Sequence, residues 1–134
     1  MKAKDETMVT FYQLLGRLFY ATAQADRVIN EEEVRVLKNA VKEVWIDLED
    51  TFDEFNSDSA YHIEIVFDYL LSNDILVEDV ISEIKEFKKI HSSLFTPKIN
   101  ELILNTTHRI IAAFAGKNKS ELVFLSQLQI VLMR

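Results

Sequence analysis

The chain has 134 residues, 49% of them hydrophobic, with two glycines, one proline and no cysteine. This length fits one domain over residues 1–134, and the lack of cysteine excludes disulfides, thiolate metal ligands and a cysteine nucleophile. The formal net charge of −7 is concentrated in residues 43–84, which hold thirteen Asp or Glu and no Lys or Arg, so we expect no nucleic acid as a partner, because this third of the chain repels phosphates.

Scarce glycine and proline favour helices over a sheet, since sheets use these residues in tight turns. Apolar residues recur three and four positions apart from about Thr7 to Ala25, which predicts a first helix. Gly16 lies within it, and we expect this glycine to allow close packing against a neighbouring helix. Asn30 and Glu33 have the spacing of a capping box, which predicts a second helix that continues through Trp45.

Four further helices are expected after an acidic turn at residues 46–58. Thr96 followed by Pro97 is typical of a helix start, because proline suits the first helical position. The four helices are predicted at Tyr61–Leu71, from Val77 to about His91, from Pro97 to near Gly116, and after a cap at Ser120.

These segments predict a compact all-α bundle of six or seven helices. Phe19, Leu37 and Trp45 lie on the apolar stripes of their helices and are expected in the core. The last helix has few polar positions, which indicates that it lies in the core or is covered by a partner. A faint internal repeat, an alanine-rich helix end followed by a polar loop and a capped helix, recurs near Ala25 and Ala115 and predicts two pseudo-symmetric halves.

No catalytic motif is found in the sequence, which lacks a Gly-rich phosphate loop, Gly-x-Ser-x-Gly and His-Glu-x-x-His. His62, His91 and His108 lie on three different predicted helices, so we expect surface or satisfied residues rather than metal ligands. The chain is therefore predicted not to be an enzyme. Its first residues lack the apolar run of a signal peptide and no stretch approaches a membrane span, which predicts a cytoplasmic protein.

Residues 18–33, LFYATAQADRVINEEE, resemble the signature of the tellurite-resistance TerB-like family. That signature is an alanine-rich helix, Ala-Asp-Gly, a hydrophobic residue, a small polar cap and Glu-Glu, with Arg27 here in place of the glycine. The resemblance implies a compact all-α fold of two related halves, an acidic surface that binds divalent cations, and a role in stress or metal resistance. Asp26 and Glu33 match the family's acidic positions.

A cation site built from oxygen ligands is the first functional hypothesis. Hard cations such as Ca²⁺ prefer carboxylates, and clustered charge raises their affinity. We expect weak binding, because the charge of Arg27 competes with the ion. The alternative is that Asp26 ends one helix and Glu33 completes the cap of the next. The residues of the site would be Asp26 and Glu33, with help from Asp47, Asp50 or Asp53.

Two functions follow from these observations. The chain is a non-enzymatic TerB-like module that binds a divalent cation weakly, a protein partner, or both. Alternatively, it is a purely structural adaptor whose acidic surface, residues 43–84, docks a basic protein partner. A homo-oligomer is open under either hypothesis.

Overall fold

The computed structural model describes residues 2–24, 29, 31–46, 61–113 and 119–133. These residues form six α-helices, one π-helical segment and one short 3-10 helix, and they contain no strand. The predicted all-α fold is therefore confirmed. The elements are α1 (Lys2–Gln24), α2 (Glu31–Ala40), η1 (Val41–Ile46), α4 (His62–Ser72), α5 (Val80–Ile90), η3 (Ser92–Leu94), α6 (Pro97–Ala112) and α7 (Lys119–Met133).

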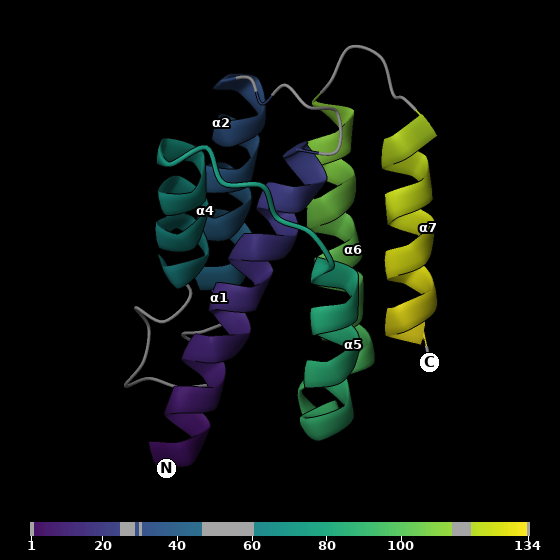
Figure 1. Ribbon diagram of the computed structural model, residues 1–134. Helices are drawn as coiled ribbons and strands as arrows, with labels where there is room; N and C mark the ends of the chain where they lie inside the picture. Colours follow the sequence, from purple (N-terminus) through teal and green to yellow (C-terminus); the bar gives the residue numbers. More distant parts are fainter. Residues whose placement is uncertain (1, 25–28, 30, 47–60, 114–118, 134) are drawn as a thin grey trace.

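The long helix α1 runs through the middle of the bundle (Figure 1). Helices α2 and α4 lie on one side of it, and α5, α6 and α7 on the other. One continuous apolar core takes side chains from every described α-helix, and the predicted core residues Phe19, Leu37 and Trp45 are fully buried. The indole N–H of Trp45 donates to Thr106 Oγ1 at 3.1 Å, so the polar atom of this buried ring is paired.

Helices α1 and α4 approach each other closely at Gly16. A Cβ built at this position would lie 2.8 Å from the carbonyl oxygen of Ile63 and 2.9 Å from the Cβ of Val66. Both contacts are shorter than van der Waals contact allows, so only glycine fits without a shift of α4. The close packing predicted for Gly16 is confirmed.

Several helix ends differ from the prediction. Helix α1 begins at Lys2 rather than Thr7, because Lys, Ala and Glu favour helix even where they add nothing to an apolar stripe. The second helix becomes π-helical at Val41, and this widened turn leaves both Val41 and Trp45 buried. Helix α7 begins at Lys119, which joins the first turn as a good helix former and places Ser120 inside the helix rather than at its cap.

The predicted start at Thr96 is confirmed, since its side chain accepts a hydrogen bond from the Ile99 N–H at 3.1 Å with Pro97 next in the chain. Helix α6 ends at Ala112, before the predicted end near Gly116. Asn30 of the capping box and residues 47–58 of the acidic turn lie outside the described residues. None of the helices in the described ranges is both long and apolar enough to cross a membrane.

Candidate docking groove

The predicted cation-site residues fall where the structure gives no side-chain placement. Asp26, Asp47, Asp50 and Asp53 lie outside the described residues, and Glu33 belongs to α2 but its side chain is not among those described. Within the described ranges, no group of three or more His, Asp or Glu side chains is placed to hold a metal ion. The cation site therefore stays a prediction.

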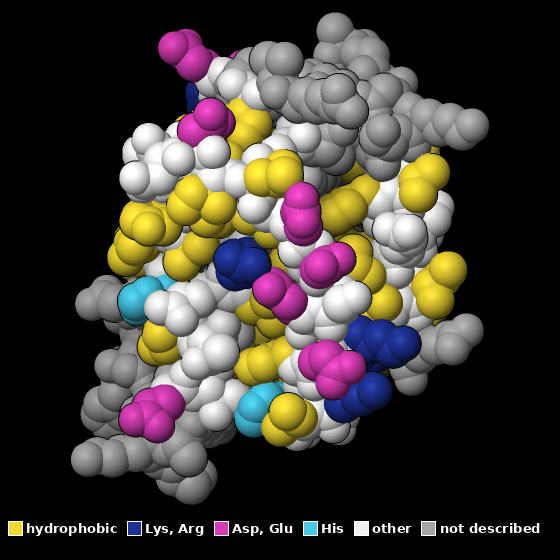
Figure 2. All heavy atoms as spheres, viewed as in Figure 1, with side chains coloured by type: hydrophobic (Ala, Val, Ile, Leu, Met, Phe, Trp, Pro, Cys, Tyr) yellow, Lys and Arg dark blue, Asp and Glu magenta, His cyan; other side chains and the backbone are white. Residues whose placement is uncertain are grey.

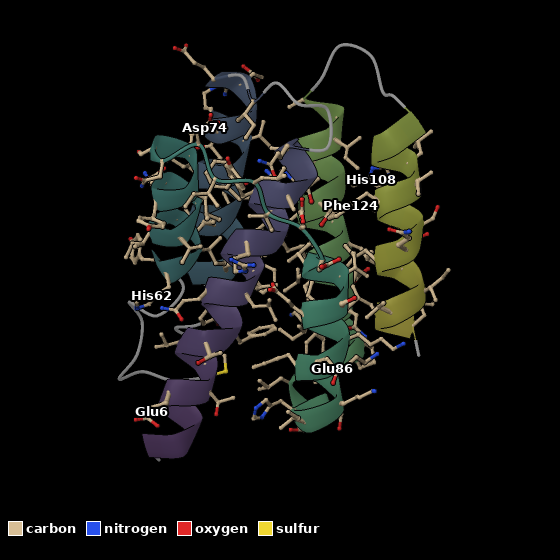
Figure 3. All side chains as sticks on the ribbon, viewed as in Figure 1. Glu6, His62, Asp74, Glu86, His108 and Phe124 are labelled. Atoms are coloured by element: carbon tan, nitrogen blue, oxygen red, sulfur yellow. The ribbon has the colours of Figure 1, made fainter. Side chains whose placement is uncertain are left out.

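The three histidines come from different parts of the bundle. His62 is half-buried on α4 and His108 is exposed on α6, and Figure 3 shows them on different sides of the molecule. His91 follows α5, where its ring centroid lies 4.6 Å from that of Phe87. The three histidines therefore come from α4, from the end of α5 and from α6, as expected from their positions in the sequence.

A groove of about 650 Å³ lies between α5 and α7. Buried Ala21, Val77 and Val80 contribute to its lining, so small and branched side chains form its deep part. Figure 2 shows hydrophobic side chains between the two helices, with acidic side chains over the start of α5 and lysines toward its end. The lining is completed by Gln24, Leu76, Asp79, Ile81, Ser82 and Lys85 on one side and by Phe124, Gln127, Ile130 and Val131 on the other.

The side-chain amide of Gln24 fixes the upper wall of this groove. Its Nε2 donates to the carbonyl oxygen of Ile75 at 2.9 Å, and its Oε1 accepts from the N–H of Val77 at 3.0 Å. Both backbone groups are thereby paired by one residue of α1. Ile75 is half-buried and Val77 buried, whereas Leu76 between them is 65% exposed. The amide of Gln24 therefore holds Leu76 outward, on the rim of the groove.

The same contacts explain why α5 begins at Val80 and not at Val77, as the sequence predicted. The backbone N–H of Val77 is bound to Gln24, and Asp79 at the N-cap has a left-handed φ of 60°, so neither belongs to a regular first turn. The first turns of α7 extend past the start of α5 (Figure 1). The groove lies beside α5, where Ile81, Ser82 and Lys85 line it.

Ionic contacts hold α5 in place beside the groove. Arg17 of α1 makes two hydrogen bonds to Glu83, Nε to Oε1 at 3.0 Å and a terminal nitrogen to Oε2 at 2.9 Å. Lys88 donates to the carbonyl oxygens of Val131 and Leu132 at 3.0 and 2.7 Å, where a cation satisfies carbonyls at the end of α7. Helix α5 is thus tied to α1 at its first turns and to α7 at its last.

Tyr20 lies one turn before Gln24 on α1 and is buried. Burial raises the pKa of its phenol above the ordinary value of 10.0, and the nearby Asp74 carboxylate raises it further. Its hydroxyl oxygen accepts a long hydrogen bond, 3.5 Å, from the Gln24 amide. The neutral phenol is therefore the form that fits beneath the 75–77 segment.

A second exposed apolar surface lies on the outer face of α4. Tyr61, Ile65 and Tyr69 follow one another four residues apart, so they share one face of the helix; Ile65 is 57% exposed and Tyr69 is 61% exposed. Glu64 and Asp68 lie on the same helix, and Lys38 of α2 pairs with Asp68 at 3.4 Å. This face belongs to the acidic third of the chain.

The groove residues were not predicted as a site. Gln24, Leu76 and Ile130 have no motif. Leu76 gains its position from its neighbour Ile75, whose carbonyl oxygen is bound by Gln24, a residue 51 positions before Ile75. The one signal in the sequence was the unusually apolar last helix, for which a covering partner was one of two interpretations. In the structure this helix lies at the edge of the bundle (Figure 1), with Leu122, Val123 and Ile130 exposed.

The chain matches no protein-family model, and no curated protein or solved structure was found to be similar to it. The resemblance to the TerB-like family accordingly stays a prediction from residues 18–33.

Proposed function

We propose that this chain is a non-catalytic protein-interaction module whose α5–α7 groove receives an amphipathic helix of a partner protein. The observation that carries the proposal is the apolar rim, where Leu76 is 65% exposed and Ile130 is 56% exposed across a groove of about 650 Å³. That volume lies within the roughly 300–1,000 Å³ of typical binding clefts. Large exposed apolar side chains gathered at one hollow mark an interaction surface more often than isolated ones do.

A helix suits this groove because its two walls are themselves helices that run side by side. Residues spaced three apart line each wall, Asp79, Ser82 and Lys85 on one and Phe124, Gln127 and Ile130 on the other. An amphipathic helix presents anchors at the matching i, i+3, i+4 and i+7 positions. Covering the groove would also bury Ile130, an exposed apolar residue of α7, which the apolar sequence of this helix favours.

The acidic adaptor is a second candidate, favoured by the apolar stripe Tyr61, Ile65 and Tyr69 on α4. Its partner would carry basic residues, since α4 contains Glu64 and Asp68 and no Lys or Arg. The TerB-like cation site is a further proposal and rests on Asp26 and Glu33. A cation site that includes Asp26 and Glu33 and a helix-binding groove are compatible in one module.

The matched pair Ile130 and Ile65 separates the two docking surfaces, because both are isoleucines with nearly equal exposure, 56% and 57%. Partners captured from native cytosol by the wild-type chain are first mapped by a photocrosslinker at position 130. The bound segment is then measured as a peptide by fluorescence anisotropy. We expect about tenfold weaker binding to Ile130→Glu, a loss of about 1.4 kcal/mol, and unchanged binding to Ile65→Glu.

The reverse result, in which only Ile65→Glu weakens binding, would show that the partner docks on the acidic face of α4 instead. Binding that neither variant weakens would contradict both docking surfaces. Thermal melts of both variants serve as the folding control, since side chains more than half exposed contribute little to the core.

A further inference from the structure

Two opposite charges stand on the α5 wall of the groove. Asp79 lies at the N-cap of α5 and Lys85 lies six residues further on, and both line the groove and are exposed. Six residues of helix correspond to about 9 Å along the axis. The wall is therefore negative where the groove opens beside Leu76 and positive where α5 and α7 come together.

Other charged groups of α5 are already engaged. Glu83 is paired with Arg17, Lys88 binds carbonyl oxygens of α7, and Lys89 pairs with Glu86 at 3.5 Å. Asp79 and Lys85 make no ion pair with any other residue of the described ranges. These two charges remain for a ligand of the groove.

We infer that the partner helix is bipolar, with a basic side chain opposite Asp79 and an acidic one opposite Lys85, about two helical turns apart. Its apolar residues lie between the two charges and contact Leu76 and Ile130. This inference rests on the proposed function of the groove and adds to it the charge pattern of the partner. Complementary charges at the rim fix the register and direction of a bound helix more than they raise its affinity.

The exposed apolar faces of a second copy, in the part of the chain that the structure describes, do not have this charge pattern. The large exposed apolar residues of the described ranges lie chiefly on α4 and α7. Residues 122–133 of α7 contain no charged side chain, and α4 contains only the acidic Glu64 and Asp68. Neither face therefore offers a basic and an acidic group two turns apart, which favours a different protein as the occupant of the groove.

Three peptides test this inference on the full chain. Each has about 15 residues, the length at which helices become stable, with leucines at helical spacing and blocked ends. One carries Lys on one side of the leucines and Glu on the other, one carries Lys on both sides, and one carries Glu on both sides. Fluorescence anisotropy measures their binding to wild type, Asp79→Asn, Lys85→Gln and Ile130→Glu. Asparagine is used at position 79 because it tolerates the left-handed backbone there.

We expect the bipolar peptide to bind wild type about two- to fivefold more tightly than either uniform peptide. Asp79→Asn should abolish its advantage over the Glu peptide, and Lys85→Gln its advantage over the Lys peptide. At about 1 M salt, where screening acts over roughly 3 Å, the three affinities should converge while binding persists.

Two results would overturn different steps. Equal binding of all three peptides to wild type, weakened in every case by Ile130→Glu, would refute the bipolar partner and leave the groove as a helix-binding site. No saturable binding of any peptide up to about 1 mM, or binding that Ile130→Glu leaves unchanged, would refute the proposed function and the inference with it.

Discussion

Gly16→Ala tests whether α1 and α4 are as close as the structure places them. By helix propensity alone the change would stabilise the protein by about 1 kcal/mol. The new Cβ, however, would lie 2.8 Å from the carbonyl oxygen of Ile63. Reaching ordinary contact near 3.4 Å requires the two helices to separate by about 0.6 Å. The carbonyl belongs to the backbone of α4 and is part of a helix that packs along α1, so no side-chain rotation relieves the clash.

Overpacking of this kind costs up to about 3 kcal/mol, which exceeds the gain in helix propensity. We therefore expect Gly16→Ala to lower the free energy of unfolding by about 2 kcal/mol, or the melting temperature by roughly 6–10 °C for a domain of this size. Urea and thermal denaturation followed by circular dichroism measure both quantities. The control is Thr10→Ala at an exposed position of the same helix, which should stabilise by at most about 0.7 kcal/mol. A Gly16→Ala variant more stable than wild type would refute the close approach of α1 and α4.

Four further predictions concern the core, the groove and the cation site. Leu37→Ala should cost about 2–5 kcal/mol in urea denaturation, because Leu37 is fully buried; a cost near zero would contradict its place in the core. Gln24→Ala should lower the free energy of unfolding by about 1–3 kcal/mol, since the Ile75 carbonyl and the Val77 N–H lose their partner. Amide hydrogen exchange at Val77 should also accelerate, and unchanged exchange would argue against the hydrogen bonds of Gln24. Because burial raises the pKa of Tyr20, the folded state holds the phenol proton more tightly than the unfolded state. This stabilisation is complete below pH of about 10 and is lost as the pH rises through the raised pKa. In alkaline denaturation, Tyr20→Phe should reduce this loss of stability. A loss that persisted unchanged in Tyr20→Phe would show that other groups cause it. Terbium luminescence or calorimetry should show cation binding with a dissociation constant of about 0.1–1 mM, and this binding should be lost in the double variant Asp26→Asn with Glu33→Gln. Equal binding by that variant would mean that Asp26 and Glu33 act only at helix ends.

The helices could be predicted from the sequence because their signals are local. The apolar periodicity around Phe19, Leu37 and Trp45 reports which face of each helix is buried, whatever that face packs against. The start at Pro97 depends on Thr96 and on Pro97 itself, so neighbouring residues suffice to predict it. Gly16 is an intermediate case, because a glycine within a helix indicates a close neighbour but does not say that the neighbour is α4.

The late start of α5 could not be predicted in this way. Val77 continues the apolar spacing of Val80, Ile81 and Ile84, so periodicity includes it in the helix. What removes it is a pair of hydrogen bonds to the side chain of Gln24, a residue 53 positions earlier in the chain. The spacing of apolar residues cannot reveal a contact between residues so far apart in the chain. A few hydrogen bonds outweigh the small preference for one more helical turn.

The groove depends on the same non-local contact, which explains why its residues carry no motif. A helix as apolar as α7 has two physical outcomes, full burial or an exposed apolar side, and the choice depends on how many neighbours surround it. Leu125, Leu128 and Leu132 are buried against the bundle, whereas Val123 and Ile130 are exposed because α7 lies at its edge. What depends on Gln24 is the opposite rim, because its bonds to Ile75 and Val77 hold Leu76 outward. The apolar rim of the groove therefore combines a local property of α7 with a non-local contact of α1, and only the first of these can be read from neighbouring residues.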